Sequence, residues 1–276
     1  MEARKKIKGG LLLALAACVL AACVLTACGA RTAPAASVQA SSETSSSAEE
    51  PAPEVPEEPE IPNRLMLPDL DVSGLKASMP AADYAAFEAY LPVLVEDQTF
   101  RWTAGPYRGY PDYDWEAKDV TLVDFHNELW DDNPHKTDAL VLDRLAVQDV
   151  DGDGTAELVM LFQDMAYNYL VLSQREDAVY GTDFSVRWFM DLQKNGVYAG
   201  SGGAGYHTYY RMSFQNGRFE EKELAQKVEW SNGYGCDCTL DGQPVTEAEF
   251  DAWYTENMVG DVTWYAPGGA VLPEGM

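Results

Sequence analysis

The chain has 276 residues, with 45 Asp and Glu against 19 Lys and Arg, and its formal net charge is −26 at pH 7. A surface with this excess of negative charge repels nucleic acid and anionic lipid, so the composition argues against both as partners of the folded surface. The length allows one hydrophobic core of ordinary size.

The N-terminal region has three parts: four basic residues, an apolar stretch over residues 11–27, and the run Leu25-Thr26-Ala27-Cys28. Small residues there precede a thiol that can accept a diacylglycerol. This arrangement resembles the lipobox of bacterial (Gram-positive type) lipoproteins. The resemblance implies a signal peptide over residues 1–27, attachment of lipid such as palmitate to Cys28, and localisation on the extracytoplasmic face of the membrane.

Two alternatives stay open for this segment. A plain secretory signal or an uncleaved anchor is compatible with 17 apolar positions, the lower edge of the about 17–25 residues that span a bilayer. Cys18 would leave too short an apolar region, but Cys23 is a possible attachment site. We favour Cys28 because a polar segment begins directly after it.

Residues 28–62 are rich in Ser, Pro and Glu, contain no aromatic residue and have Arg31 as their only base. Such a segment buries too little apolar surface to offset its ordering entropy, so we expect a disordered linker. Removal of residues 1–27 leaves 15 basic and 44 acidic residues, a formal net charge of −29. We expect one globular domain over residues 63–276, held away from the membrane by this linker.

The remaining elements follow from periodicity. Residues 83–91 and 121–130 are typical of helices, and residues from 144 onward are typical of strands. Strands are expected at 145–147, 158–162, 169–172, 188–190, 209–214 and around the Cys-x-Cys motif. A capping box over residues 246–249 opens a last helix with Phe250, Trp253 and Tyr254 on its buried side. The pattern predicts an α+β fold with a largely antiparallel meander, N-terminal helices and one C-terminal helix.

The segment 149–157 reads Asp-Val-Asp-Gly-Asp-Gly-Thr-Ala-Glu. Carboxylates at positions 1, 3 and 5 point into a tight loop, and Gly154 supplies the sharp turn. Hard oxygen ligands at this spacing suit Ca²⁺ better than Mg²⁺. The predicted ligands are Asp149, Asp151, Asp153, the backbone carbonyl of Thr155, and Glu157.

The loop departs from the EF-hand pattern because position 12 is Met160 and its flanks are typical of strands. It is similar to the D-x-D-x-D-G-x-x-[DE] loop of FG-GAP-type repeats in propeller proteins, but a single copy predicts no propeller. A polar turn without a metal is the alternative. We expect a structural Ca²⁺ that stabilises a hairpin rather than a catalytic ion.

The segment 200–205 matches G-x-G-x-x-G, but a strand pattern follows it instead of the helix that a dinucleotide site requires. We therefore expect a flexible loop. Ser201, with His207 and an aspartate, is the candidate catalytic set of the chain, and no nucleophile elbow surrounds it. The other histidines are His126 and His135, without metal-ligand spacing.

Aromatic residues crowd a segment that contains Gly and Pro. Their rings can stack on sugars or on a peptide, or they can cover the core. The possible ligand surface consists of Trp102, Tyr107, Tyr110, Tyr113 and Trp115.

Cys236 and Cys238 form a C-x-C motif in a predicted strand. Their Cα atoms would lie about 6.6–6.8 Å apart, at the outer limit for a disulfide. We favour two small side chains on one face of the strand over a redox or thiol–metal pair.

The segments 180–187, 200–205 and 240–246, together with the D-x-D-G-D-G-x-x-E-L core, resemble a group of uncharacterised lipoproteins from Gram-positive gut bacteria. The resemblance covers residues 145–254 and implies no activity. The sequence therefore predicts a membrane-anchored, non-enzymatic binding or interaction module, stabilised by Ca²⁺, with an envelope glycan or protein as partner. The alternative is a cell-envelope hydrolase. A solute-binding protein would need two α/β lobes, against which the strand-rich C-terminal half argues.

Overall fold

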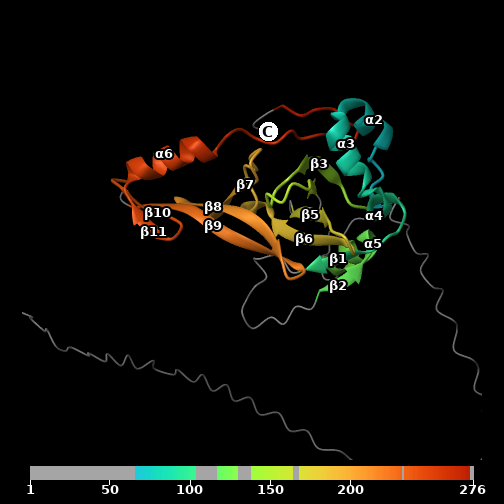
Figure 1. Cartoon of the computed structure of the whole chain (residues 1–276), viewed down its shortest axis with the longest axis horizontal. Coiled ribbons are helices and arrows are strands. Elements are labelled where there is room, and N and C mark those ends of the chain that lie inside the picture. The colour runs from blue at the N-terminus through green and yellow to red at the C-terminus, as the bar shows by residue number, and fades with distance from the viewer. Residues whose placement is uncertain (1–65, 104–116, 130–137, 164–167, 232, 274–276) are drawn as a thin grey trace, which may run out of the picture. The chain divides into compact units, whose positions relative to one another are not determined.

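The computed structural model describes residues 66–103, 117–129, 138–163, 168–231 and 233–273, all within a unit that spans residues 57–276. The helices are α2 (Val72–Ser78), α3 (Ala81–Glu88), α4 (Leu91–Val95), α5 (Leu122–Leu129) and α6 (Glu247–Asn257), with one 3₁₀ turn, η2 (Val186–Trp188). The strands are β1 (Phe100–Thr103), β2 (Lys118–Val120), β3 (Leu142–Gln148), β4 (Glu157–Phe162), β5 (Asn168–Gln174), β6 (Val179–Ser185), β7 (Val197–Gly203), β8 (Tyr206–Gln215), β9 (Arg218–Glu229), β10 (Cys236–Leu240) and β11 (Gln243–Val245). Figure 1 shows their arrangement.

The described strands form two sheets. Sheet A has the order β2-β1-β6-β5-β4-β3, and sheet B has the order β11-β10-β9-β8-β7. Among the strand pairs of the described residues, β1 and β6 run parallel and the others run antiparallel. The predicted α+β class with largely antiparallel sheets is confirmed.

Sheet A is buried on both faces, as the burial of β4 illustrates. Each of its six residues is buried, and alternate residues of a strand point to opposite faces. Met160 therefore belongs to a core shared with the helices, and Val159 belongs to a second core shared with sheet B. The fully apolar stretch of the sequence is the consequence of this double burial.

The first of these cores, which we call the helix-side core, joins sheet A to α2, α3, α4 and α5. Phe87, Phe125 and Leu172 lie in it and are fully buried. Trp102 is also fully buried there, in an edge-on contact with Phe125 at 5.1 Å between ring centroids. This core packs the four helices against one face of sheet A.

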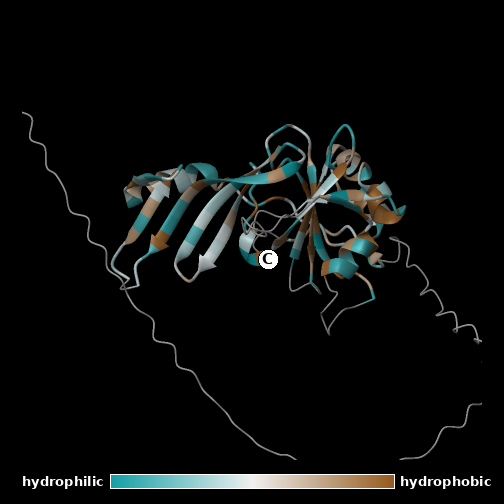
Figure 2. Ribbon diagram, turned by 90° about the horizontal axis from the view of Figure 1, so that it is seen from below, coloured by the Kyte–Doolittle hydropathy of each residue, from teal (hydrophilic) through white to brown (hydrophobic). Residues whose placement is uncertain are grey.

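The second core, which we call the inter-sheet core, lies between sheet A and the β7–β9 part of sheet B. Aromatic rings dominate it: the ring centroid of Phe189 lies 4.5 Å from that of Tyr198 and 5.0 Å from that of Phe184, in tilted contacts. Figure 2 shows that hydrophobic segments concentrate in sheet A and its helices, whereas hydrophilic segments are more frequent in sheet B. Sheet B is thus the more solvated of the two.

Helix α6 packs on sheet B through a third, smaller core. Thr246 caps the helix and forms the predicted capping box with Glu249. Phe250 is buried, and Trp253 contacts Tyr209 at 5.6 Å. Tyr254 is 41% exposed, so its predicted place on the buried side is only partly correct, although it also contacts Tyr209.

Several predicted elements differ from the structure. The helix expected over 83–91 ends at Glu88, and Pro92, expected at its end, lies in the first turn of α4, where a missing N–H costs nothing. The strand expected at 188–190 does not form, because Trp188 ends the 3₁₀ turn η2 and Met190 makes an isolated bridge to Ala199.

The Gly-rich segment 200–205 is the clearest correction, because residues 200–203 are the end of β7 and only residues 204 and 205 form a turn, the one that leads to β8. At Gly200 an added Cβ would lie 2.9 Å from the ring of Tyr210 and 3.3 Å from that of Trp188. The glycine therefore permits aromatic rings to lie directly on the strand.

Within the described residues, no helix has the length and apolar character needed to cross a bilayer. The predicted signal peptide, Cys28 and the whole of the predicted linker lie outside the described residues.

Candidate metal loop and its surroundings

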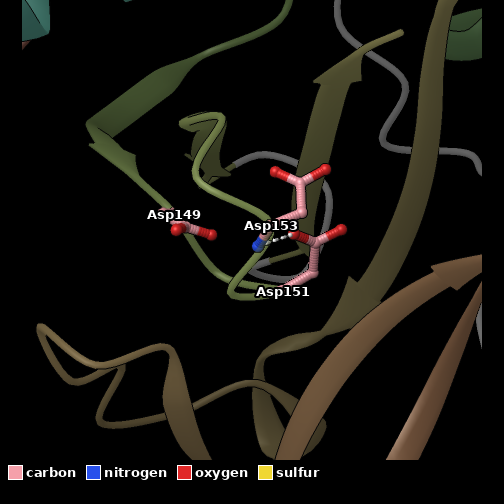
Figure 3. Close-up of side chains that lie close together, drawn as sticks. All are labelled: Asp149, Asp151 and Asp153. Carbon is pink, nitrogen blue, oxygen red and sulfur yellow. Dashed lines mark hydrogen bonds between the residues drawn. The ribbon is translucent and has the colours of Figure 1, made fainter.

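The loop between β3 and β4, residues 149–157, brings three carboxylates together. One ligand oxygen from each of Asp149, Asp151 and Asp153 lies within 4.8 Å of the others, so this cluster can hold a metal ion. Figure 3 shows the three side chains on one short loop, with Asp151 and Asp153 next to each other. The sequence prediction is confirmed for these three residues as a cluster.

Backbone N–H groups hold the carboxylates in place. Asp149 accepts hydrogen bonds from Gly152 at 2.7 Å and from Gly154 at 3.0 Å. Asp151 accepts from the N–H of Asp153 at 3.1 Å. The loop turns at Gly154, whose φ of +90° lies in a region that side chains disfavour. The backbone of the turn thus positions the carboxylate oxygens.

A cation already faces the loop: the guanidinium of Arg175, which directly follows β5. Its Nη2 lies 2.5 Å from Asp151, and its Nη1 pairs with Asp153. The guanidinium carbon lies 4.5 Å from the ring centroid of Phe214. Burial tends to raise the pKa of Asp153, but the Thr155 N–H and Arg175 outweigh it and hold the pKa below its ordinary value.

Glu157, the fourth predicted carboxylate ligand, lies behind the loop. Its side chain is completely buried, and it accepts hydrogen bonds from the N–H of Val150 at 2.9 Å and from the hydroxyl of Ser173 at 2.8 Å. Arg175 lies 3.6 Å from it. Burial, opposed by the Val150 N–H and reinforced by the charge of Asp151, raises the pKa of Glu157 to about 8.

The structure therefore divides the predicted ligand set. The three aspartates form the cluster, whereas Glu157 is not part of it and is bound from below by Val150 and Ser173. Thr155 lies at the exposed end of the loop, where its N–H donates to Asp153 at 2.7 Å. Glu157, hydrogen-bonded to Val150 and Ser173, therefore supports the loop from the core side.

The tyrosine that precedes α4 ties the loop to the helix-side core. The hydroxyl of Tyr90 donates to the carbonyl of Ala156 at 2.8 Å and accepts from the N–H of Gln174 at 3.2 Å. The side chain is 1% exposed, and burial raises its pKa. This bridge fixes the loop against the end of β5, which also delivers Arg175.

Sequence reasoning missed Arg175, Ser173 and Tyr90. The register of the β4–β5 hairpin, in which Leu158 pairs with Leu172, is the signal that places Ser173 beside Glu157 and Arg175 beside the loop. No local pattern identifies the distant Tyr90.

The candidate catalytic residues are distributed over different elements. His126 is buried on α5, which packs on sheet A, whereas Ser201 and His207 lie on β7 and β8 of sheet B. The hydroxyl of Ser201 donates to the carbonyl of Gly203 at 3.2 Å, within its own hairpin. His135 lies outside the described residues. The structure does not bring His126 together with Ser201 and His207.

The predicted ligand surface requires a correction at Trp102. The side chain is completely buried, and its indole N–H donates to Asp183 at 3.0 Å, so it belongs to the core rather than to an exposed platform. The other residues of this prediction lie outside the described residues: Tyr107, Tyr110, Tyr113 and Trp115.

In comparisons with known proteins, no protein-family model, no curated protein and no solved structure matches the chain.

Proposed function

We propose that the chain is a lipid-anchored, extracytoplasmic binding protein whose folded part is stabilised by Ca²⁺ at the 149–157 loop. The partner is an envelope glycan or protein. The observation that supports this proposal most strongly is the cluster of Asp149, Asp151 and Asp153 within 4.8 Å, because hard oxygen ligands in a tight loop are the environment that Ca²⁺ prefers.

The proposed anchor rests on the Leu25-Thr26-Ala27-Cys28 run behind a basic and apolar segment. Two or more acyl chains make such an attachment durable. Mass spectrometry of the full chain from a bacterial membrane fraction should show acylation at Cys28, and Cys28→Ala should remove it. Acylation that persists in Cys28→Ala and disappears in Cys23→Ala would assign the lipid attachment site to Cys23. A chain without any acyl group would contradict the proposed lipid anchor.

The proposed Ca²⁺ takes the place of Arg175 beside Asp151 and Asp153. The guanidinium spreads one positive charge over several nitrogens, whereas Ca²⁺ brings two charges to one point between the oxygens. The net negative charge of the chain favours the incoming ion. The ion's role is structural: bound Ca²⁺ neutralises the repulsion of the three carboxylates and holds the β3–β4 hairpin.

Thermal unfolding of the full chain tests this role. An extracellular-type affinity of about 10⁻⁴–10⁻³ M gives on the order of 1 kcal/mol of linkage at millimolar Ca²⁺. This energy corresponds to a Tm higher by about 2–4 °C in CaCl₂ than in EDTA. MgCl₂ should give a smaller shift because Mg²⁺ requires stricter octahedral geometry.

The matched variant is Asp151→Asn, which keeps an oxygen to accept the Asp153 N–H and removes the charge. Its Tm should not respond to Ca²⁺. An equal response in the wild type and Asp151→Asn would place the ion elsewhere, and the absence of a response in both would leave Arg175 as the cation of the loop.

The binding role requires a partner, which a glycan array and a cross-linking pull-down with the full chain can identify. Retention of one glycan class or one envelope protein, lost on unfolding, is the expected result. Turnover of an ester, amide or glycoside substrate that Ser201→Ala abolishes would support the envelope hydrolase instead.

A further inference from the structure

A second chemically distinctive place lies at one end of sheet B, where β9, the turn at residues 233–235 and the starts of β10 and α6 line an open pocket of about 370 Å³. Tyr234, which is 90% exposed, stands at its rim. We call it the thiol pocket, and it is lined by Lys227, Glu229, Gly233, Tyr234, Gly235, Cys236 and Glu247.

The pocket opens onto one member of a pair of thiols. Cys236 is half-buried, Cys238 is 5% exposed, and both are free. Their Sγ atoms lie 3.4 Å apart on the same face of β10. The two thiols therefore differ in access but lie in van der Waals contact, so a small movement of the strand brings them within bonding distance.

The surroundings favour redox chemistry over a metal. Among the described residues, the group of three or more potential metal ligands is that of the 149–157 loop, which we call the aspartate loop. Cys236 and Cys238 do not belong to such a group. Lys227 occupies the position beside the thiols and forms an ion pair with Glu247 at 2.8 Å. A cationic side chain at this point repels a metal ion, and its ion pair with Glu247 occupies the nearest carboxylate.

We propose that Cys236 and Cys238 form a redox-active dithiol that undergoes exchange with small disulfides entering the thiol pocket. The Cys236 thiolate attacks one sulfur of the external disulfide R–S–S–R, forms a mixed disulfide and expels RS⁻, which takes up the proton that Cys236 lost. Cys238 then loses its proton and attacks the Cys236 sulfur, closing the intramolecular disulfide and releasing the second RSH. Two electrons pass from the dithiol to the external disulfide.

Burial and the charges around the pocket determine the rate of the first step through the pKa of Cys236. Burial, then Cys238 and then the carboxylate of Glu247, raise the pKa of Cys236 to about 11. The other titratable groups that line the pocket are Lys227 and Glu229 on β9 and Tyr234 in the turn, and Asp251 of α6 acts on Lys227. The thiolate is therefore scarce at neutral pH, and the exchange rate should rise about tenfold per unit between pH 7 and 10.

The redox state of Cys236 and Cys238 can be measured on a single tryptic peptide. No Lys or Arg follows Lys227, so trypsin releases residues 228–276 as one peptide whose only cysteines are Cys236 and Cys238. The reduced full chain is equilibrated in buffers of reduced and oxidised glutathione, blocked with N-ethylmaleimide, unfolded and digested. In oxidised buffer the peptide should lose two hydrogens and carry neither maleimide nor glutathione. Two maleimides throughout the series, or two glutathiones without ring closure, would overturn the proposal.

Three single variants assign the roles. Cys238→Ala should accumulate a glutathione adduct on Cys236, and Cys236→Ala should leave Cys238 largely unmodified because it is buried. Glu247→Gln removes the nearest negative charge and should accelerate the exchange several-fold at pH 7.5. Glu256→Gln, an exposed site on the same helix, is the control and should leave the rate unchanged. Equal rates in both glutamine variants would exclude the proposed electrostatic control.

Discussion

The aspartate loop and the thiol pocket lie at the ends of strands in different sheets, and they differ in what lies behind them. The loop stands at the end of β3 and β4, in the sheet that is buried on both faces, and its supporting carboxylate Glu157 is fully buried and hydrogen-bonded. The thiol pocket lies at the solvated end of sheet B, beside the exposed Tyr234. A doubly buried sheet holds charged groups in one geometry, whereas a partly covered sheet gives small molecules access to reactive groups.

The largest expected effect tests the difference between the two sheets. Leu172, in the centre of sheet A, is fully buried, and Leu172→Ala should cost about 2–5 kcal/mol of unfolding free energy because it leaves a cavity. Leu240 on β10 of sheet B is partly buried, and Leu240→Ala should cost less than half as much. Urea unfolding of the full chain measures both. Equal losses would mean that sheet B is as tightly packed as sheet A.

The next effect comes from Glu157. Its folded pKa of about 8 lies above the ordinary value for Glu, so the folded state binds the proton more tightly. The stabilising contribution of this proton is complete below the unfolded pKa near 4.3 and is lost as the pH rises through 8. Glu157→Gln keeps acceptor and donor atoms for Val150 and Ser173 and cannot ionise.

We therefore expect metal-free Glu157→Gln to exceed the wild type in unfolding free energy at pH 8.5, by on the order of a few kcal/mol. At pH 4.5 the two proteins should be nearly equal. Unfolding in urea and EDTA across this pH range checks the prediction. Parallel pH profiles for both proteins would show that Glu157 ionises normally and would contradict its raised pKa.

A smaller effect separates backbone strain from packing in the loop. At both Gly154 and Gly268 an added Cβ meets nothing within 4 Å, but Gly154 has a φ of +90°. Gly154→Ala should therefore cost about 1–2 kcal/mol, and Gly268→Ala should be close to neutral. Differential scanning calorimetry compares the pair. If the two variants unfold at the same temperature, the loop does not require its left-handed turn.

Local patterns predicted much of sheet A and the helices around it. The apolar stretch of β4 is a direct consequence of burial, and the amphipathic α5 and the capping box at Thr246 have signals within a few residues. The three aspartates were predictable as a cluster for the same reason, because their spacing within one tight loop determines where their oxygens lie.

What could not be predicted depends on contacts between distant residues. The parallel pairing of β1 with β6 joins Trp102 to Gly181, and no local pattern encodes that register. The helix-side core buries Trp102, and the aromatic composition of its segment alone did not distinguish a ligand surface from a core cover. Arg175 reaches the loop only through the hairpin register of β4 and β5. Each of these requires the tertiary fold.

The central claim is that Ca²⁺ and Arg175 compete for Asp151 and Asp153, and calorimetric titration of Ca²⁺ into the full chain tests it most directly. The wild type should bind one Ca²⁺ per chain at this loop. Arg175→Gln, which removes the competing cation but keeps a polar side chain, should bind it several-fold more tightly, and Asp151→Asn should abolish the heat of this site. Absence of a Ca²⁺ heat in both the wild type and Arg175→Gln would contradict the claim and leave a loop closed by its own arginine.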